Sequence, residues 1–291
     1  MNGSDKINIS ELSKPRISRW LFNTILDWAI IIFLMIVAIK LNHPVVYILS
    51  VFFIGTRQHA LAIMGHDGAH YAACKNRQLN DFMASIFVFW PLGIGINGYR
   101  KFHFAHHKKV GTPEDPELIL KRLSRPQWEL PAKNSKHITH LIKDLLGISY
   151  RELFKISRSI RSVGKIDIIG PVVWWLVMIG TLSYFGQYIP LILWFASVFT
   201  SYWAVFRLRV WFEHQGTSQT NRVHAVWWQK LIFAPHNVWY HYEHHLFPSI
   251  PFYNLNKVRN MENEKPIVSI GELFRSFRVH SFLGSGRIKY Q

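Results

Sequence analysis

The chain has 291 residues, of which 49% are hydrophobic and 15% aromatic, and its formal net charge is +17. A chain that is both apolar and basic is typical of two classes: a nucleic-acid-binding protein, or a membrane protein whose basic loops lie on one side. The single cysteine, Cys74, excludes an intrachain disulfide and a Cys-x-x-Cys zinc site.

Four apolar segments predict membrane-spanning helices in two hairpins. Residues 20–39 match the ~20 apolar residues needed to cross a bilayer, and residues 45–65 follow after a short link. Residues 166–186 and 189–206 form a second tight pair. Residues 82–98 are apolar but interrupted by proline and glycine, which predicts a re-entrant or interfacial segment. The expected fold class is an all-α integral membrane protein with a cytosolic helical cap.

The polar segments 1–19, 99–165 and 207–291 hold nearly all of the lysine and arginine residues. Because basic loops stay on the cytoplasmic side, this distribution predicts that both termini and the large middle loop are cytoplasmic. It also argues against a nucleic-acid partner. We expect a cytosolic N-terminal segment at 1–19, a membrane domain with its cap at 20–260, and a cytosolic C-terminal tail at 261–291.

Histidine is grouped in three stretches, "HDGAH" at 66–70, "HFAHH" at 103–107 and "HYEHH" at 241–245. On a helix, residues at i, i+3 and i+4 share one face, with Cβ atoms roughly 5–6 Å apart. An HxxHH pattern is expected by chance only roughly 0.05 times in a chain of this composition. Eight histidines exceed the ligands of one tetrahedral zinc and suit two metal ions of higher coordination number. Imidazole alone allows iron, zinc, copper or nickel. The candidate ligands are His66, His70, His103, His106, His107, His241, His244 and His245.

The order and flanks of these stretches resemble the three histidine boxes of the membrane fatty acid desaturase/hydroxylase superfamily. The segments that carry the resemblance are "HDGAHYAACKNRQLND", "YRKFHFAHHKKVGTPEDPE" and "NVWYHYEHHLFPSIPFYNL", and it extends from about residue 45 to about residue 260. It implies a non-haem di-iron centre on the cytosolic side. It also implies that O₂ and two electrons are used to remove hydrogen from an unactivated C–H bond.

The resemblance implies one more ligand after the fourth crossing, and His214 in "RVWFEHQGT" occupies that place. One branch of the family has an asparagine four residues before this histidine, but here that position is Val210. Asn237, four residues before His241, is the alternative polar group beside the metals.

Three carboxylates lie in or beside the histidine groups: Asp67, Glu213 and Glu243. We expect them to accept the far ring N–H of a ligand histidine, which fixes its tautomer and raises its basicity. For Asp67 and Glu243 an exposed position paired with lysine or arginine is an equal alternative. His137 and His140, distant in sequence from every box, are expected to be surface histidines.

The function predicted from the resemblance is an O₂-dependent desaturase of an acyl lipid or acyl thioester. A hydroxylase or ketolase of a lipid, carotenoid or small molecule is the alternative. A metal transporter is a more distant alternative, because it requires ligands near the membrane midplane and the histidine groups lie at or outside the predicted spans. The chain has no recognisable cytochrome b5, iron–sulfur or G-x-G-x-x-G signature, so electrons are expected from a separate, acidic ferredoxin or cytochrome b5. A bacterial inner membrane is favoured over the endoplasmic reticulum, and the oligomeric state is left open.

Overall fold

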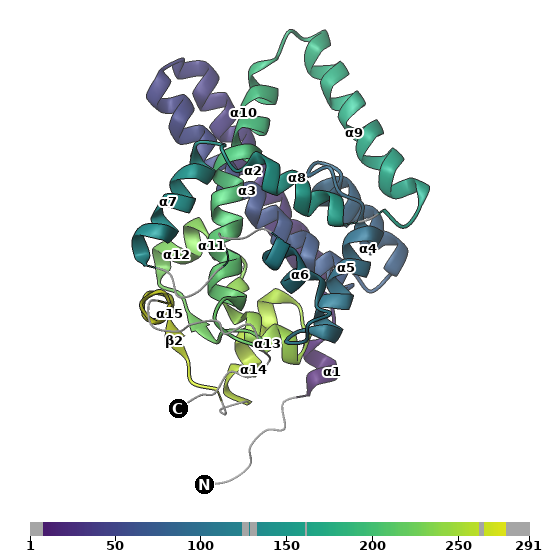
Figure 1. The fold of residues 1–291 in the computed structure, drawn as a ribbon. Helices are drawn as coiled ribbons and strands as arrows, with labels where there is room; N and C mark the ends of the chain where they lie inside the picture. Colours follow the sequence, from purple (N-terminus) through teal and green to yellow (C-terminus); the bar gives the residue numbers. More distant parts are fainter. Residues whose placement is uncertain (1–7, 124–127, 129–132, 161, 262–264, 278–291) are drawn as a thin grey trace.

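The computed structural model describes residues 8–123, 128, 133–160, 162–261 and 265–277. Four helices in it are long and apolar enough to cross a membrane, as the sequence predicts. The first hairpin consists of α2 (Ile17–Leu41) and α3 (Pro44–Ala69). The second consists of α9 (Lys165–Tyr184) and a continuous helix, Ile189–His214, and α9 diverges from that helix away from the connecting loop (Figure 1).

Residues in the left-handed region lie in both hairpin turns. Asn42 ends α2 with a φ of 44°, and Gly186 follows α9 with a φ of 66°. These residue types tolerate positive φ better than others, so the local sequence favours a turn at each point. The expected hairpins are therefore confirmed, although both second helices continue past their predicted ends.

The fourth span contains an irregular turn. It is built from α10 (Ile189–Ser197), a π-helical turn η2 (Val198–Tyr202) and α11 (Trp203–His214). At η2 the span touches α3 very closely: a Cβ added to Gly55 would lie 2.0 Å from Ser201 Oγ and 2.5 Å from the backbone nitrogen of Tyr202. Only glycine therefore permits this contact without a shift of the helices.

The remaining elements form a helical cap at one end of the spans (Figure 1). The described part of the chain is all-α apart from one parallel pair of two-residue strands. The elements are α1 (Ile9–Leu12), α4 (Arg77–Ala84), π-helical η1 (Ser85–Phe89), α5 (Ile96–Lys109), α6 (Pro116–Leu123), α7 (Asn134–Leu145), α8 (Tyr150–Ser159), β1 (Val223–His224), α12 (Trp227–Ile232), η3 (Val238–Tyr240), α13 (His241–Leu246), η4 (Phe252–Asn254), α14 (Leu255–Val258), η5 (Arg259–Met261), β2 (Val268–Ser269) and α15 (Ile270–Ser276).

The apolar segment 82–98 is a bent helical connection. The end of α4 and η1 contact α3, and a turn at Trp90–Gly93, with Gly93 at φ 73°, leads into α5. The break occurs at the proline and glycine positions, as the sequence predicts. The segment is too short to be one of the four spanning helices.

Two groups of buried polar contacts connect the cap to the second hairpin. Asp167, in the first turn of α9, accepts hydrogen bonds from the backbone nitrogens of Asn97 (3.2 Å) and Gly98 (2.8 Å) at the start of α5. Arg207 in α11 is fully buried, with its Nε 2.5 Å from Asp144 Oδ2 of α7 and its Nη2 2.7 Å from Glu152 Oε2 of α8. These contacts fix α5 and α11, the two helices that carry four of the predicted ligands.

Candidate metal centre

All nine predicted histidine ligands gather where the ends of four helices meet. His66 lies in the last turn of α3 and His70 directly follows it, while His214 ends α11. The other two groups lie on single faces of α5 and α13. Five of the nine are buried and four are half-buried; the buried ones are His66, His103, His106, His241 and His244.

Five of the histidines form the first group: His66, His70, His103, His107 and His244, with ligand atoms all within 4.8 Å of one another. Within it, the Nε2 atom of His103 lies 2.9 Å from that of His70 and 3.0 Å from that of His107. His107 Nε2 also lies 3.1 Å from His244 Nε2. A ring nitrogen has either one hydrogen or one lone pair, so it cannot make two such contacts as ordinary hydrogen bonds. Two nitrogens that bind the same ion at about 2.1 Å, with a right angle between the two bonds, lie about 3.0 Å apart. A cation shared by these rings would therefore explain the observed spacing.

The second group consists of His106, His214 and His245, with His241 and Glu213 beside His214. His241 Nε2 lies 2.9 Å from His214 Nε2 and 3.1 Å from His245 Nε2, which repeats the spacing of the first group. The rings of His107 and His245 stack with centroids 4.2 Å apart, so the two groups are adjacent.

Two of the half-buried ligand histidines, His70 and His107, are in the right state to bind metal. Burial lowers the pKa of His70 to about 3 and that of His107 to about 4, so both are neutral and keep a lone pair at pH 7. Among the described residues, His66 Nε2 and His106 Nε2 are buried without a hydrogen-bond partner. Buried polar atoms rarely stay unpaired, and imidazole suits first-row transition metals. The residues present therefore fit two metal ions.

Two carboxylates of the segment 111–117, which were not among the predicted site residues, lie beside His106. Asp115 Oδ1 is 2.9 Å from His106 Nδ1, and Glu117 Oε2 is 3.5 Å from His106 Nε2 and 3.9 Å from His214 Nε2. Burial lowers the pKa of His106, but Glu117 and Asp115 outweigh it and raise that pKa overall. The segment "GTPEDPE", which reads as a turn, was the available signal, because it follows the second box directly.

The four groups predicted to support the ligands have different environments. Glu213 is buried, with Oε1 3.4 Å from His241 Nδ1 and 2.7 Å from Arg209 Nε. Asp67 is also buried, but its nearest approach to His66 Nδ1 is 3.9 Å, and it accepts a hydrogen bond from the Phe252 nitrogen instead (3.0 Å).

The other two supporting groups bind elsewhere in the cap. Glu243 is fully buried and pairs with Arg222 Nε (2.8 Å) and Arg259 Nε (3.1 Å). The alternative expectation for Glu243 was an exposed position paired with lysine or arginine. The pairing with arginine is present, but the expected exposure is wrong because Glu243 is buried. Asn237 donates its side-chain amide to the Phe252 carbonyl (3.0 Å).

The expectation that His137 and His140 lie on the surface is wrong. Their exposed fractions are 5% and 9%, and the His137 ring meets that of Trp211 edge to face, with centroids 4.7 Å apart. Because α7 packs against α11, the face of α7 that carries both histidines is covered. Neither histidine belongs to the metal groups found in the described part of the chain.

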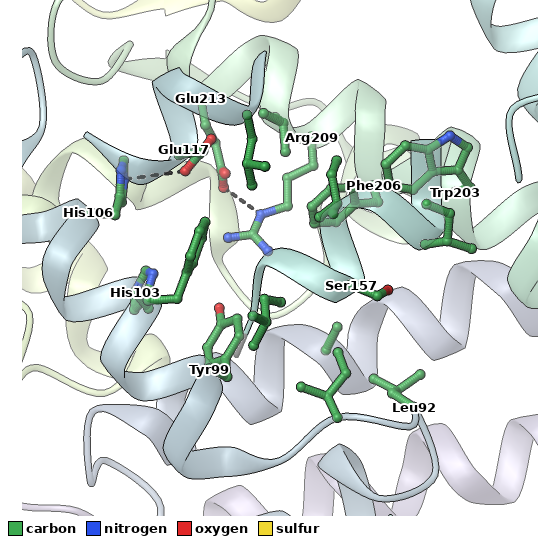
Figure 2. Close-up of a pocket in the computed structure, with 18 of the residues that line it drawn as sticks. Leu92, Tyr99, His103, His106, Glu117, Ser157, Trp203, Phe206, Arg209 and Glu213 are labelled. Atoms are coloured by element: carbon green, nitrogen blue, oxygen red, sulfur yellow. Dashed lines mark hydrogen bonds and ion pairs between the residues drawn. The ribbon is translucent and has the colours of Figure 1, made fainter. Parts of the chain in front are cut away.

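A cavity of about 140 Å³ opens beside the histidines (Figure 2). Its walls are mainly apolar and come from η1, α5, α8 and α11, and His103, His106, His214 and His241 form part of them. Trp203 lines the cavity. Trp90 packs against Gly170 instead, where an added Cβ would lie 2.3 Å from the Trp90 ring. A cavity with metal ligands on one side and apolar walls can hold an alkyl group against the metals.

Comparison with known proteins agrees with this geometry. The family model described as fatty acid desaturase matches residues 42–267. The chain is similar to a dihydrorhizobitoxine desaturase of Bradyrhizobium elkanii, at 27% identity over 246 residues, covering 76% of this chain and 68% of the relative. It is also similar to an sn-1 acyl-lipid omega-3 desaturase (ferredoxin) of Nostoc sp. (strain 36), at 23% identity over 296 residues, covering 91% and 79%. The chain is a membrane protein and belongs to the fatty acid desaturase family.

Proposed function

We propose that this protein is an O₂-dependent membrane desaturase that introduces a C=C bond into an acyl chain at a di-iron centre. The single observation that carries the proposal is the pair of adjacent histidine groups, with ring nitrogens 2.9–3.1 Å apart, beside a mainly apolar cavity. Removal of two substrate hydrogens, together with two electrons and two protons from outside, reduces O₂ to two molecules of water.

The residues divide into ligands and supporting groups. His66, His70, His103, His107 and His244 would hold one iron, and His106, His214, His241 and His245 the other. The irons would supply O₂ activation and oxidation of an unactivated C–H bond. Asp115 orients the His106 ring through Nδ1, and Glu213 lies close enough to His241 Nδ1 to orient that ring. The apolar cavity wall excludes water from the reacting carbon.

Two further features support an enzyme with a separate electron donor. The histidines lie at the ends of α3 and α11, whereas a metal transporter needs ligands near the midplane. The Nostoc relative is named for ferredoxin, and the net charge of +17 favours an acidic carrier of that kind. In this proposal both termini and the cap face the cytoplasm, in a bacterial inner membrane.

Metal analysis of the detergent-purified, iron-loaded protein tests the centre. We expect about two irons per chain, with most of the metal lost when His244 and His245 are both changed to alanine. His224→Ala is the matched control, because His224 is exposed on β1 and outside both groups. Equal metal content in all three proteins would sink the proposal. Lipid profiling of an expressing host then tests the reaction, with a new double bond expected and a hydroxyl group as the contrary product.

A further inference from the structure

The cavity beside the histidines has two chemically different ends (Figure 2). Leu92, Trp203 and Phe206 lie on the side away from His106 and Glu117, and the helix α8 adds Leu153 and Ile156 to the apolar lining. Arg209 lies between the two sides, with its guanidinium group directed into the cavity. A bound molecule would therefore meet a cation next to the metal ligands and hydrocarbon farther away.

Arg209 is well buried, and its hydrogen-bonding capacity is mostly unused. Its exposed fraction is 7%, and its Nε donates to Glu213 Oε1 at 2.7 Å. Glu213 Oε1 is also the atom that lies 3.4 Å from His241 Nδ1, so a single carboxylate oxygen separates the guanidinium group from the metal centre. Among the described residues, the two terminal nitrogens of Arg209 have no hydrogen-bond partner.

Two tyrosine hydroxyls in the same cavity are also without a partner among the described residues. Tyr99 stacks on His103 with ring centroids 5.4 Å apart, and Tyr202 lines the wall beside Trp203. Neither hydroxyl makes a hydrogen bond within the described part of the chain. Hydroxyl groups that face a cavity normally find an acceptor in water or in a bound molecule. The cavity thus offers hydrogen-bond donors from three side chains, Arg209, Tyr99 and Tyr202.

A plain methylene chain placed here would strip water from the guanidinium nitrogens and supply no acceptor in return, which is costly for a buried charge. A carboxylate matches the terminal nitrogens of arginine in a two-bond contact. We propose that the substrate is a free carboxylic acid whose carboxylate binds Arg209, and that oxidation occurs close to that end of the molecule. This inference rests on the proposed function and specifies its substrate as an acid in place of an acyl ester or thioester.

The placement of Arg209 also determines which carbons approach the metals. A carboxylate bound to the terminal nitrogens lies next to the histidine side, and the alkyl part extends toward Trp203 and Leu92 (Figure 2). The methylene groups nearest the carboxylate are then the ones beside the metal ligands. A lipid ester bound by its headgroup outside the cavity would present carbons far from its carbonyl group.

Binding to the iron-loaded, detergent-purified full chain tests this assignment. The probes are octanoate, its neutral ester methyl octanoate and its neutral amide octanamide, measured by isothermal titration calorimetry. We expect octanoate to bind about tenfold tighter than either neutral probe, as a charge-assisted contact implies. In Arg209→Gln this preference should fall to within about twofold, and Arg209→Lys should retain part of it. Arg158→Gln, which removes a positive charge from an exposed position of α8, should leave the preference unchanged.

Equal binding of the three probes to the unmodified protein would overturn the inference, whether or not the variants fold. So would a carboxylate preference that survives in Arg209→Gln, because the acid would then bind elsewhere, for example directly to iron. Mass spectrometry of the octanoate product gives the second check, since a modification near the methyl end contradicts the assignment. Failure of the proposed function is distinguishable: the acid preference would stand, but no acid, ester or thioester would be oxidised.

Discussion

His106 in α5 is hydrogen-bonded to Asp115, the residue before α6, with Nδ1 of the imidazole 2.9 Å from Oδ1 of the carboxylate. The same oxygen accepts the backbone N–H of Glu117 at 2.9 Å and so also holds the first turn of α6. One carboxylate thus fixes both the tautomer of a ligand and the position of the segment that follows the second histidine box.

Asp115→Asn tests that contact. The amide can still accept the Glu117 N–H, but it removes the negative charge that holds a proton on His106 Nδ1. Loss of such an outer partner typically weakens metal affinity about 10- to 100-fold. A chelator competition assay on the iron-loaded protein would measure the change. Glu114→Gln is the control, because Glu114 is exposed in the same loop, and an equal loss in both variants would contradict the role of Asp115.

Arg207→Met tests the buried clamp between α11, α7 and α8. The substitution leaves Asp144 and Glu152 buried without their cation, which typically costs about 3–5 kcal/mol of unfolding free energy. We expect a large drop in the melting temperature in detergent. Lys14→Ala breaks an exposed pair with Glu11 and should cost about 0–1 kcal/mol. Similar melting temperatures for the two variants would refute a clamp role.

Gly55→Ala tests the contact between α3 and η2. A Cβ there meets a backbone nitrogen as well as Ser201, so the helices must move apart, at a cost of about 1–3 kcal/mol. The added methyl group should also disturb the cavity, because Tyr202 and Trp203 line it. Gly180→Ala in α9 is the matched control, since an added Cβ there has nothing within 4 Å. Thermal stability in detergent would be unchanged or raised in the control.

Because His137 is buried, we expect the stability of the protein to depend on pH. Burial lowers its pKa below the usual value of about 6.5. The unfolded chain therefore takes up a proton first as the pH falls, so the stabilisation is complete above about pH 6.5 and declines below it. His137→Phe, which keeps the contact with Trp211, should reduce the fall in melting temperature between about pH 6.5 and pH 5, while other buried histidines such as His70 and His107 account for the rest of the fall. An unchanged slope in the variant would mean that other groups cause the loss.

The parts that could be predicted from the sequence are those with a local signal. Runs of apolar residues define the four spans, and repeated histidine spacing places eight side chains on helix faces. His214 was placed through family resemblance, and the structure brings it to the second group.

What could not be predicted depends on contacts between distant segments. The sequence spacing of His137 and His140 says nothing about α11, which covers them. Arg207 pairs with Glu152 and Asp144, which precede it by 55 and 63 positions in the sequence. No sequence periodicity predicts a pairing over such separations. Arg209 also belongs to no recognisable sequence motif. Its position in the cavity depends on how α8 and α11 are placed relative to each other, which the sequence does not show.

The π-helical turn η2 makes the fourth span one residue longer than a regular helix with the same ends. Deleting a single residue between Val198 and Tyr202 would therefore leave a regular helix that still crosses the bilayer, with the residues beyond the deletion close to their present positions. A count of 100° per residue carried through this turn would place Arg209, Glu213 and His214 about 100° away from the face that they occupy. The extra residue thus sets which face of α11 meets the histidine groups, and helical periodicity in α10 does not reveal it.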